Sequence, residues 1–375
     1  MMNLLDICKI GGSSVKKFDG TRKYIATGDI IDNEIASYEL VNYNNKPSRA
    51  NVEIKNSDVL FAKMKDTVKV LKANENNINN IYSTGFYCMT PNDNVLHEYL
   101  YYYFKSESFN SQKNKNCTGA TQKAINNEGL KKIKIKFLPG LEEQNKIVKE
   151  LSCVERLITI KNEEVNKLNL LVKSQFVEMF KNVNETVRLG DCCDVHARIG
   201  WQALTSKEHM KHGDYMLITG TDFKNNEIDY STCVYVTKER YEMDEHIILK
   251  NDDILITKDG TIGKVAIVHN LPKPSTLNGG VFVVRPDERF NKEYITYVFK
   301  GPLFEKYVNK SKTGATIKHL NQKHLVEFCI PMPSLEEQLK FSEIYKQIDK
   351  QKFEFEKSLK KLQELQESLM QEYFG

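Results

Sequence analysis

The stretch LPGLEEQNKIVKEL, residues 138–151, has a close counterpart near the end of the chain in PMPSLEEQLKFSEI, residues 331–344. In both, a Leu-Glu-Glu-Gln quartet (Leu141–Gln144 and Leu335–Gln338) follows a proline and opens a long run of charged and apolar residues. A proline at the start and glutamates in the first turn are typical of a helix N-terminus. The quartets begin 194 positions apart in a chain of 375 residues, so the sequence predicts the same helix twice.

The repeat extends far beyond the quartets. Further matches lie on both sides of them at an offset of 194 or 195 positions, and the offset falls to 185 at the start of the copies. The second copy therefore carries about ten extra residues early on. So many matches in one register predict two copies of one module, each a globular part followed by a long helix. The matching segments are CTGATQKAINNEGLKKIKIKFLP (117–139) with KTGATIKHLNQKHLVEFCIPMP (312–333), SDVLFAK (57–63) with DDILITK (252–258), EYLYYYFKS (98–106) with EYITYVFKG (293–301), and LLDICKI (4–10) with LGDCCDV (189–195).

The two long segments have the pattern of a coiled-coil seam. No glycine or proline occurs from Leu141 to about Lys181, and apolar residues recur at steps of three, four or seven. About forty residues at ~1.5 Å each give a rod of roughly 60 Å, apolar along one stripe, which needs a partner. We expect the two rods to pair antiparallel. The expected seam is Ile147, Leu151, Val154, Ile158, Val165, Leu168, Val172 and Met179 in the first copy, with Phe341, Tyr345, Ile348, Phe355, Leu359, Leu362 and Leu369 in the second.

The globular parts are predicted to be rich in short strands, with a few helices. DDILITKDGTIGKVAIV (252–268) reads as two strands joined by a turn at Asp259-Gly260, and NGGVFVVRP (278–286) as another strand. The aromatic residues of 98–106 and 293–301 fit a helical core better than a base-stacking surface. The predicted fold class is α+β, with two pseudo-twofold-related α/β domains joined by two long antiparallel coiled-coil helices. The expected divisions are 1–139 and 184–333 for the domains, and 140–183 and 334–375 for the helices.

Composition and charge narrow the class of protein. There is no run of eighteen apolar residues and no apolar segment at the start, and the eight cysteines form no Cys-x-x-Cys pair. These features favour a cytoplasmic protein with free thiols. The net charge is only +4, but residues 113–136 hold seven lysines against one acid, and residues 305–325 hold five against one. Such patches either bind phosphates or form a solvated lysine face.

Signals of catalysis are missing from the sequence. DGTIGK (259–264) has two residues between its glycines where a P-loop needs four, so it reads as a turn. The patterns of serine hydrolases, zinc proteases, dinucleotide-binding folds and adenine methyltransferases do not occur. CCDVH (192–196) could ligate a metal, but we expect no metal site and no catalytic residue. A rigid, two-headed protein with basic turns suits an extended polyanion such as DNA, read by loops at the ends of strands.

These features together resemble the specificity subunit of type I restriction–modification enzymes, over essentially the whole chain. The most specific are the Thr-Gly-Ala-Thr…Pro…Leu-Glu-Glu-Gln pattern, which occurs twice, and the loop DILITKDGTIGKVAIV (253–268). The resemblance implies two target recognition domains, each reading half of a split, asymmetric sequence in double-stranded DNA. It also implies two methyltransferase (modification) subunits as partners, which methylate adenine, and in some systems nuclease/translocase (restriction) subunits. S-adenosylmethionine, ATP and Mg would be bound by those partners, and this chain would hold no cofactor.

Candidate DNA-binding residues follow from the two basic loops and the two Thr-Gly-x-Thr turns, although the first copy has AKMKDTVKV (62–70) in place of the glycine-rich TKDGTIGKV (257–265). That difference fits either a different half-site or a degraded first domain. The threonine turns could equally cap the helix that follows each of them. Two other classes stay open: a coiled-coil scaffold or orphan DNA-binding subunit without a nuclease partner, and a standalone enzyme, against which the missing motifs count. The candidates are Lys63, Lys65, Thr118, Thr121 and Lys123 in the first copy, and Lys258, Asp259, Thr261, Lys264, Thr313, Thr316 and Lys318 in the second.

Overall fold

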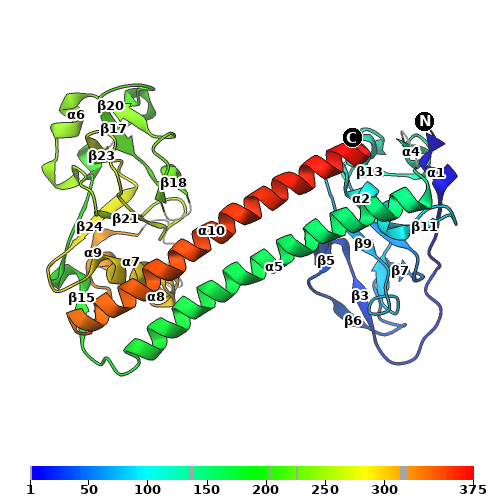
Figure 1. The fold of residues 1–375 in the computed structure, drawn as a ribbon, viewed down its shortest axis with the longest axis horizontal. Helices are drawn as coiled ribbons and strands as arrows, with labels where there is room; N and C mark the ends of the chain where they lie inside the picture. The colour runs from blue at the N-terminus through cyan, green and yellow to red at the C-terminus, as the bar shows by residue number, and fades with distance from the viewer. Residues whose placement is uncertain (1, 136–138, 203, 225–226, 313–319) are drawn as a thin grey trace. The chain divides into compact units, whose positions relative to one another are not determined.

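The computed structural model describes residues 2–135, 139–202, 204–224, 227–312 and 320–375. The chain forms two compact units (Figure 1). Unit 1 comprises Met1–Glu163 with Glu356–Gly375, and unit 2 comprises Glu164–Phe355. The boundary crosses both long helices, so each unit contains a head and a part of each helix.

The head of unit 1 holds two four-stranded sheets. One has the order β2-β11-β8-β9 and is antiparallel, and the other has the order β6-β3-β10-β7, in which β3 and β10 run parallel. Short pairs of strands (β1 with β14, β4 with β5, β12 with β13) complete it. The elements are β1 (Met2–Asn3), α1 (Leu4–Ile7), β2 (Cys8–Ile10), β3 (Arg22–Ile25), β4 (Ile30–Ile31), β5 (Glu34–Ile35), β6 (Glu39–Val41), β7 (Ala50–Val52), β8 (Val59–Ala62), β9 (Val70–Lys72), β10 (Ile81–Ser83), β11 (Phe86–Pro91), α2 (His97–Lys105), α3 (Glu107–Lys115), β12 (Cys117–Thr118), β13 (Ala124–Ile125), α4 (Asn127–Leu130) and β14 (Lys134–Ile135).

The head of unit 2 repeats this plan. Its antiparallel sheet has the order β16-β24-β21-β22, and its second sheet has the order β20-β17-β23 with β17 and β23 parallel. These orders match those of unit 1, as the repeat predicts, except that a single bridge between Ile248 and Thr276 takes the place of β7. The elements are β15 (Thr186–Arg188), β16 (Cys193–Ala197), β17 (Tyr215–Ile218), β18 (Phe223–Lys224), β19 (Glu227–Ile228), β20 (Val234–Val236), α6 (Lys238–Glu242), β21 (Ile254–Thr257), β22 (Val265–Ile267), β23 (Ser275–Leu277), β24 (Val281–Pro286), α7 (Lys292–Lys300), α8 (Pro302–Lys312), α9 (Gln322–Val326) and β25 (Cys329–Pro331).

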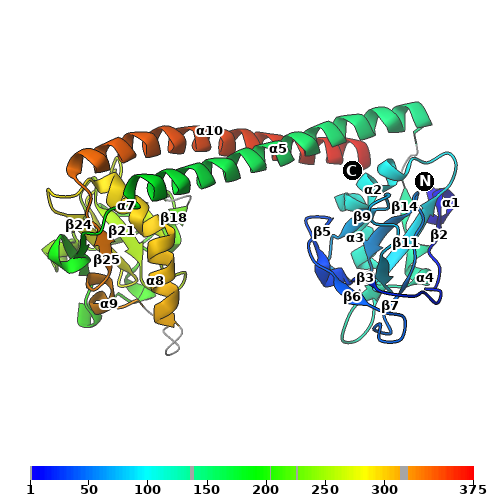
Figure 2. The same ribbon diagram turned by 90° about the horizontal axis from the view of Figure 1, so that it is seen from below.

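The aromatic helices of the two heads are core elements. In α2 every residue from Tyr99 to Phe104 is buried, and in α7 every residue from Glu293 to Phe299 is buried. Each packs between the antiparallel sheet of its head and the long helices (Figure 2). The prediction that these aromatic residues form core is confirmed. The chain is extended at Ser106 and at Gly301, so each of these helices ends there and a second helix, α3 or α8, follows.

The two long helices are α5 (Leu141–Phe180) and α10 (Leu335–Phe374), and each has forty residues. In unit 1 the start of α5 shares a core with the end of α10, through Leu151 and Phe374. In unit 2 the end of α5 shares a core with the start of α10, through Phe176 and Phe341, whose ring centroids lie 5.4 Å apart. Within each unit the helices therefore run antiparallel. Every residue of the predicted seam is buried or half-buried, which confirms the coiled-coil pattern.

No helix in the described parts of the chain combines the length and the apolarity needed to cross a bilayer. The charged residues spread around α5 and α10 account for this, since each helix is apolar along one stripe only.

Candidate functional site

A lysine at the end of a central strand has the same backbone partners in both heads. The amide of Lys63, after β8, donates to the carbonyl of Gly85 at 2.9 Å, and its carbonyl accepts from Ile125 at 2.9 Å. The amide of Lys258, after β21, donates to Gly280 at 2.9 Å, and its carbonyl accepts from Leu320 at 2.9 Å. These bonds join three segments that are far apart in sequence. We call this arrangement the loop frame.

The side chains of the same lysines lie over aromatic rings at equivalent positions. Lys63 Nζ is 4.3 Å from the ring centre of Tyr87, and Lys258 Nζ is 5.3 Å from that of Phe282. A cation over a ring face is held by the quadrupole of the ring. Burial of Lys63 lowers the pKa of its ammonium. Both lysines are half-buried, which fits side chains that hold the frame.

In unit 1 the frame brings the predicted residues together. Residues 63–65 run antiparallel to residues 123–125, because the amide of Lys65 also donates to the carbonyl of Lys123 at 2.9 Å. The side chains of the predicted residues beyond Lys63 are all exposed, and they form one polar surface. That surface consists of Lys65, Thr118, Thr121 and Lys123.

The Thr-Gly-Ala-Thr turn of unit 1 joins β12 to β13 and does not cap the helix that follows. The cap of α4 is Asn126, whose Oδ1 accepts from the amide of Gly129 at 2.9 Å. Asn126 Nδ2 in turn donates to Thr118 Oγ1 at 3.3 Å. The capping alternative is therefore wrong for these threonines, although Thr118 supports the cap. Gly119 has φ +127°, and a Cβ there would stand 2.5 Å from the carbonyl oxygen of Gln122.

In unit 2 the loop between β21 and β22, residues 258–264, folds around Thr257. Its hydroxyl donates to the carbonyl of Thr261 at 2.6 Å and accepts from the amide of Lys264 at 2.9 Å. Gly260 and Gly263 take φ values of +67° and +87°, which this tight path requires. Lys258 and Asp259 are half-buried here, whereas Thr261 and Lys264 are exposed.

The equivalent loop of unit 1 has the same length but is held by side chains of α3, which lie outside the loop. The buried Lys113 of α3 donates from Nζ to the carbonyl of Thr67 at 2.5 Å. Asn114 exchanges two hydrogen bonds with Asp66, at 2.9 and 3.0 Å, and Asp66 has φ +55°. Side chains of α3 thus replace the glycines of unit 2. The first loop is an ordered alternative to the second.

Sequence reasoning missed one lysine of these loops, and three of the predicted residues stay predictions. Lys69 stands where unit 2 has Lys264, since the pairs Ala62–Lys69 and Thr257–Lys264 share the same backbone hydrogen bond. Lys69 Nζ donates to the carbonyl of Thr27 at 2.7 Å, so it ties the loop to its own head. The fixed offset of 195 would have identified it. Thr313, Thr316 and Lys318 lie outside the described residues.

A hollow of about 310 Å³ opens beside the loop frame of unit 2. Lys258 and Asp259 line it, together with Arg198 at the end of β16 and Asn321, the cap of α9. Arg198 is 2% exposed and donates to Leu277 and Thr276. In unit 1 the strand equivalent to β16 is β2, which ends at Ile10 and is followed by two glycines and Ser13, so the arginine is specific to unit 2.

The glutamines of the two Leu-Glu-Glu-Gln quartets attach each head to its helix. Gln144 is fully buried, accepts from the amide of Leu96 at 2.9 Å, and donates to the carbonyls of Asn94 and Pro139. Gln338 is also fully buried and makes the equivalent three bonds, to Asn291, Arg289 and Pro333. This glutamine clamp explains why the quartet occurs twice.

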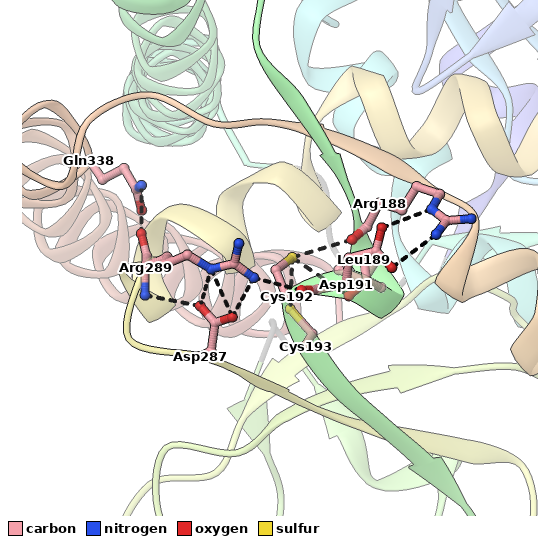
Figure 3. A network of polar contacts seen from close by, with 8 residues as sticks. All are labelled: Arg188, Leu189, Asp191, Cys192, Cys193, Asp287, Arg289 and Gln338. Carbon is pink, nitrogen blue, oxygen red and sulfur yellow. Dashed lines mark hydrogen bonds and ion pairs between the residues drawn. The ribbon is translucent and has the colours of Figure 1, made fainter.

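In unit 2 the clamp continues into a polar network (Figure 3). Arg289 pairs with Asp287 at 2.7 Å and donates to the carbonyl of Asp191 at 2.6 Å. The network reaches Cys192 and Cys193, whose Sγ atoms lie 3.8 Å apart. Among the described residues no group of three His, Cys, Asp or Glu side chains is placed to hold a metal ion.

Comparison with known proteins gives one consistent result. The type I restriction modification DNA specificity domain family matches residues 1–170 and again residues 182–367. The type I restriction enzyme MjaVIII specificity subunit of Methanocaldococcus jannaschii is 27% identical over 295 residues, covering 71% of this chain and 68% of that protein. The putative type I restriction enzyme MjaX specificity subunit of the same organism is 25% identical, covering 96% of this chain and 83% of that protein.

Solved structures show the same fold. A chain from a structural study of complex assembly and conformational transition of the type I R-M system aligns with a TM-score of 0.59 at 20% identity, covering 99% of this chain and 96% of that chain. The type I restriction-modification S subunit of M. genitalium aligns with a TM-score of 0.60 at 15% identity, covering 100% and 95%. The two family matches coincide with the two copies of the repeat and together span nearly all of the sequence. The chain therefore belongs to the type I restriction modification DNA specificity domain family.

Proposed function

We propose that this chain is the DNA-binding specificity subunit of a type I restriction–modification system, in which each unit reads one half of a bipartite, asymmetric target. The observation that carries the proposal is the loop frame, which is the same in both heads while the loops built on it differ. A common frame presents both loops to DNA in the same way. Different loops then give each head its own half-site.

The exposed cations of the loops supply the attraction to DNA. Phosphate contacts by lysine provide most of the binding free energy, and base contacts provide the sequence preference. Lys65 and Lys123 in unit 1 and Lys264 in unit 2 are exposed and suit phosphate contact. Lys63 and Lys258 lie against aromatic rings and act by positioning the loops. Thr118, Thr121 and Thr261 offer exposed hydroxyls, which suit either phosphate or base edges.

The chemistry on DNA belongs to partner subunits. Two modification subunits methylate adenine with bound S-adenosylmethionine, and restriction subunits, in systems that have them, use ATP and Mg. The chain itself holds no cofactor and acts in the cytoplasm, where the DNA is. Support for two equal partners comes from the glutamine clamp, because both helix starts have the same form and offer two similar docking faces.

Salt-dependent DNA binding tests the loops. The full chain is purified with its modification subunits and bound to target DNA at several salt concentrations. Lys264→Ala should weaken binding and lower the slope of log K against log salt by about one, because one phosphate contact is lost. Lys167→Ala, at an exposed position of α5, should change neither. Equal losses at both positions would show that the loops are not the DNA surface.

A coiled-coil scaffold without a DNA role is the alternative from another class. A scaffold role does not explain why the two heads have the same loop frame but different loops built on it. A scaffold would direct no methylation, so sequencing of adenine methylation in cells with and without the gene separates the two functions. Methyl transfer to DNA by the isolated chain would contradict both.

A further inference from the structure

One position of the loop built on the frame differs in chemistry between the heads, although the backbone hydrogen bonds around it are equivalent. Residues 64 and 259 directly follow the lysine of the loop frame and are 195 positions apart. The backbone bonds before them, and those that close the loop at residues 69 and 264, are equivalent. The position holds methionine in unit 1 and aspartate in unit 2, so it changes from an apolar side chain to a hydrogen-bond acceptor.

Met64 is an exposed apolar side chain within a basic loop. It is 39% exposed, forms a backbone bridge with Ala124, and has Lys63 and Lys65 as its neighbours in sequence. It belongs to none of the hydrophobic clusters formed by the described residues. Its exposed part is therefore open to contact with a bound molecule. The apolar group that duplex DNA displays in its major groove is the C5-methyl of thymine.

Asp259 lines the hollow beside the loop frame of unit 2. Its Oδ2 is 3.5 Å from the point where a Cβ on Gly280 would stand, so the carboxylate lies over the glycine turn of the frame. It shares the hollow with Lys258 and Arg198. Arg198 Nη1 is buried and has no hydrogen-bond partner among the described residues. In the major groove a carboxylate accepts from an exocyclic amino group, which adenine and cytosine present and guanine and thymine do not.

We propose that residues 64 and 259 are equivalent specificity-determining positions. Asp259 accepts a hydrogen bond from the amino group of an adenine or a cytosine in one half-site. Met64 packs against the methyl group of a thymine in the other half-site. The inference rests on the proposed function. It names, for one residue in each head, the kind of base that the residue selects.

The test is methylome sequencing of cells that express the full chain with its modification subunits. Asp259→Ala should make one position of one half-site degenerate, with loss of on the order of tenfold discrimination. Met64→Asp should replace thymine with adenine or cytosine at one position of the other half-site. Asp259→Asn separates the two bases: it keeps adenine, which asparagine binds through N6 and N7, and it converts a cytosine position to adenine.

Control variants separate a change in base recognition from a general effect on the protein. Asp214→Met, on the exposed loop before β17 and outside the hollow, should leave both half-sites unchanged. Should Asp259→Ala lower the melting temperature, Asp259→Leu takes its place, because leucine has nearly the shape of aspartate without the acceptor. An unchanged half-site in both Asp259 variants overturns the inference and leaves the proposed function intact. A wild-type chain that directs no methylation overturns the proposed function itself.

Discussion

At the scale of single residues, the turn at Gly119 makes a strict demand on the sequence. Its φ of +127° disfavours any side chain, and a Cβ at this position would lie only 2.5 Å from the carbonyl oxygen of Gln122. No other residue fits there without movement of the turn. The turn carries Thr118 and Thr121, and its strands join residues 123–125 to the loop frame. Strain at this glycine would therefore reach the polar surface formed by Lys65, Thr118, Thr121 and Lys123.

Gly119→Ala should cost about 1–3 kcal/mol of unfolding free energy and weaken recognition of one half-site only. Gly28→Ala is the matched control, since a Cβ there meets no atom within 4 Å and the backbone does not have positive φ. Thermal unfolding measures the first effect, and methylome sequencing measures the second. Equal behaviour of the two variants would mean that the turn adjusts without cost.

At the scale of elements, the glutamine clamp determines how each head meets its helix. Gln144→Leu and Gln338→Leu should each cost about 2–5 kcal/mol, because each leaves one backbone amide and two backbone carbonyls without partners. Gln351→Leu, at an exposed position of α10, should cost almost nothing. Denaturant unfolding measures the loss of stability, and hydrogen exchange locates it. The loss should lie in unit 1 for Gln144→Leu and in unit 2 for Gln338→Leu. A loss shared by both units would contradict separate clamps.

An ion pair between the end of α2 and α5 in unit 1 differs from the contact at the equivalent place in unit 2. Lys105 at the end of α2 pairs with Glu155 of α5 at 2.6 Å, and Tyr102 donates to the same carboxylate at 2.8 Å. Burial alone would raise the pKa of Glu155, but the charge of Lys105 and these two hydrogen bonds outweigh it and lower the pKa. At the equivalent place in unit 2, Lys300 donates to the hydroxyl of Tyr345 at 3.3 Å.

Glu155→Gln should lower the unfolding free energy by about 2 kcal/mol near neutral pH. Because the folded pKa lies below the unfolded value, the contribution is complete above the unfolded pKa and disappears as the pH falls through the folded one. The difference between variant and wild type should therefore shrink below about pH 4.5. Asp349→Asn, the change at the equivalent position in unit 2, should have the smaller effect. Urea unfolding across the acid range measures the stability of both variants. A loss of stability in Glu155→Gln that does not depend on pH would show that the Lys105–Glu155 ion pair is not its cause.

The sequence predicted elements better than it predicted contacts. Both long helices, their seam and the aromatic core helices follow from periodicity, because a 3.6-residue repeat of apolar residues depends on the local sequence alone. The break at Ser106 and the role of Lys113 did not follow. By charge pattern Lys113 belongs to the basic patch of residues 113–136, yet it is buried against Thr67, a residue 46 positions earlier. Pattern alone cannot distinguish a lysine that holds a loop from one that faces solvent.

At the scale of the whole molecule, the helices are the parts that both units share. The boundary between units falls after Glu163 in α5 and after Phe355 in α10. We expect the length of these helices to set the number of unread base pairs between the half-sites. Four residues inserted at both boundaries add about one turn, or up to ~6 Å, and should lengthen the unread spacer by roughly one or two base pairs. Methylome sequencing reads the spacer directly.

The control for this prediction uses a shorter insertion. Two residues at each boundary rotate the apolar stripe by about 200°, so packing and directed methylation should both be lost. With four residues the stripe stays nearly in phase, and both half-sites should keep their bases. A spacer that does not change in the four-residue variant would show that the helices do not measure the distance.

The division of the chain also has a consequence for its synthesis on the ribosome. Unit 2 is one continuous segment, Glu164–Phe355, whereas the core of unit 1 includes Leu369, Met370, Tyr373 and Phe374 from the end of the chain. The first head to be translated therefore remains incomplete until these last residues have been made, although the second head can already close. A premature stop within α10 after Phe355 would spare the half-site read by the later-made head and disable the one read by the earlier-made head.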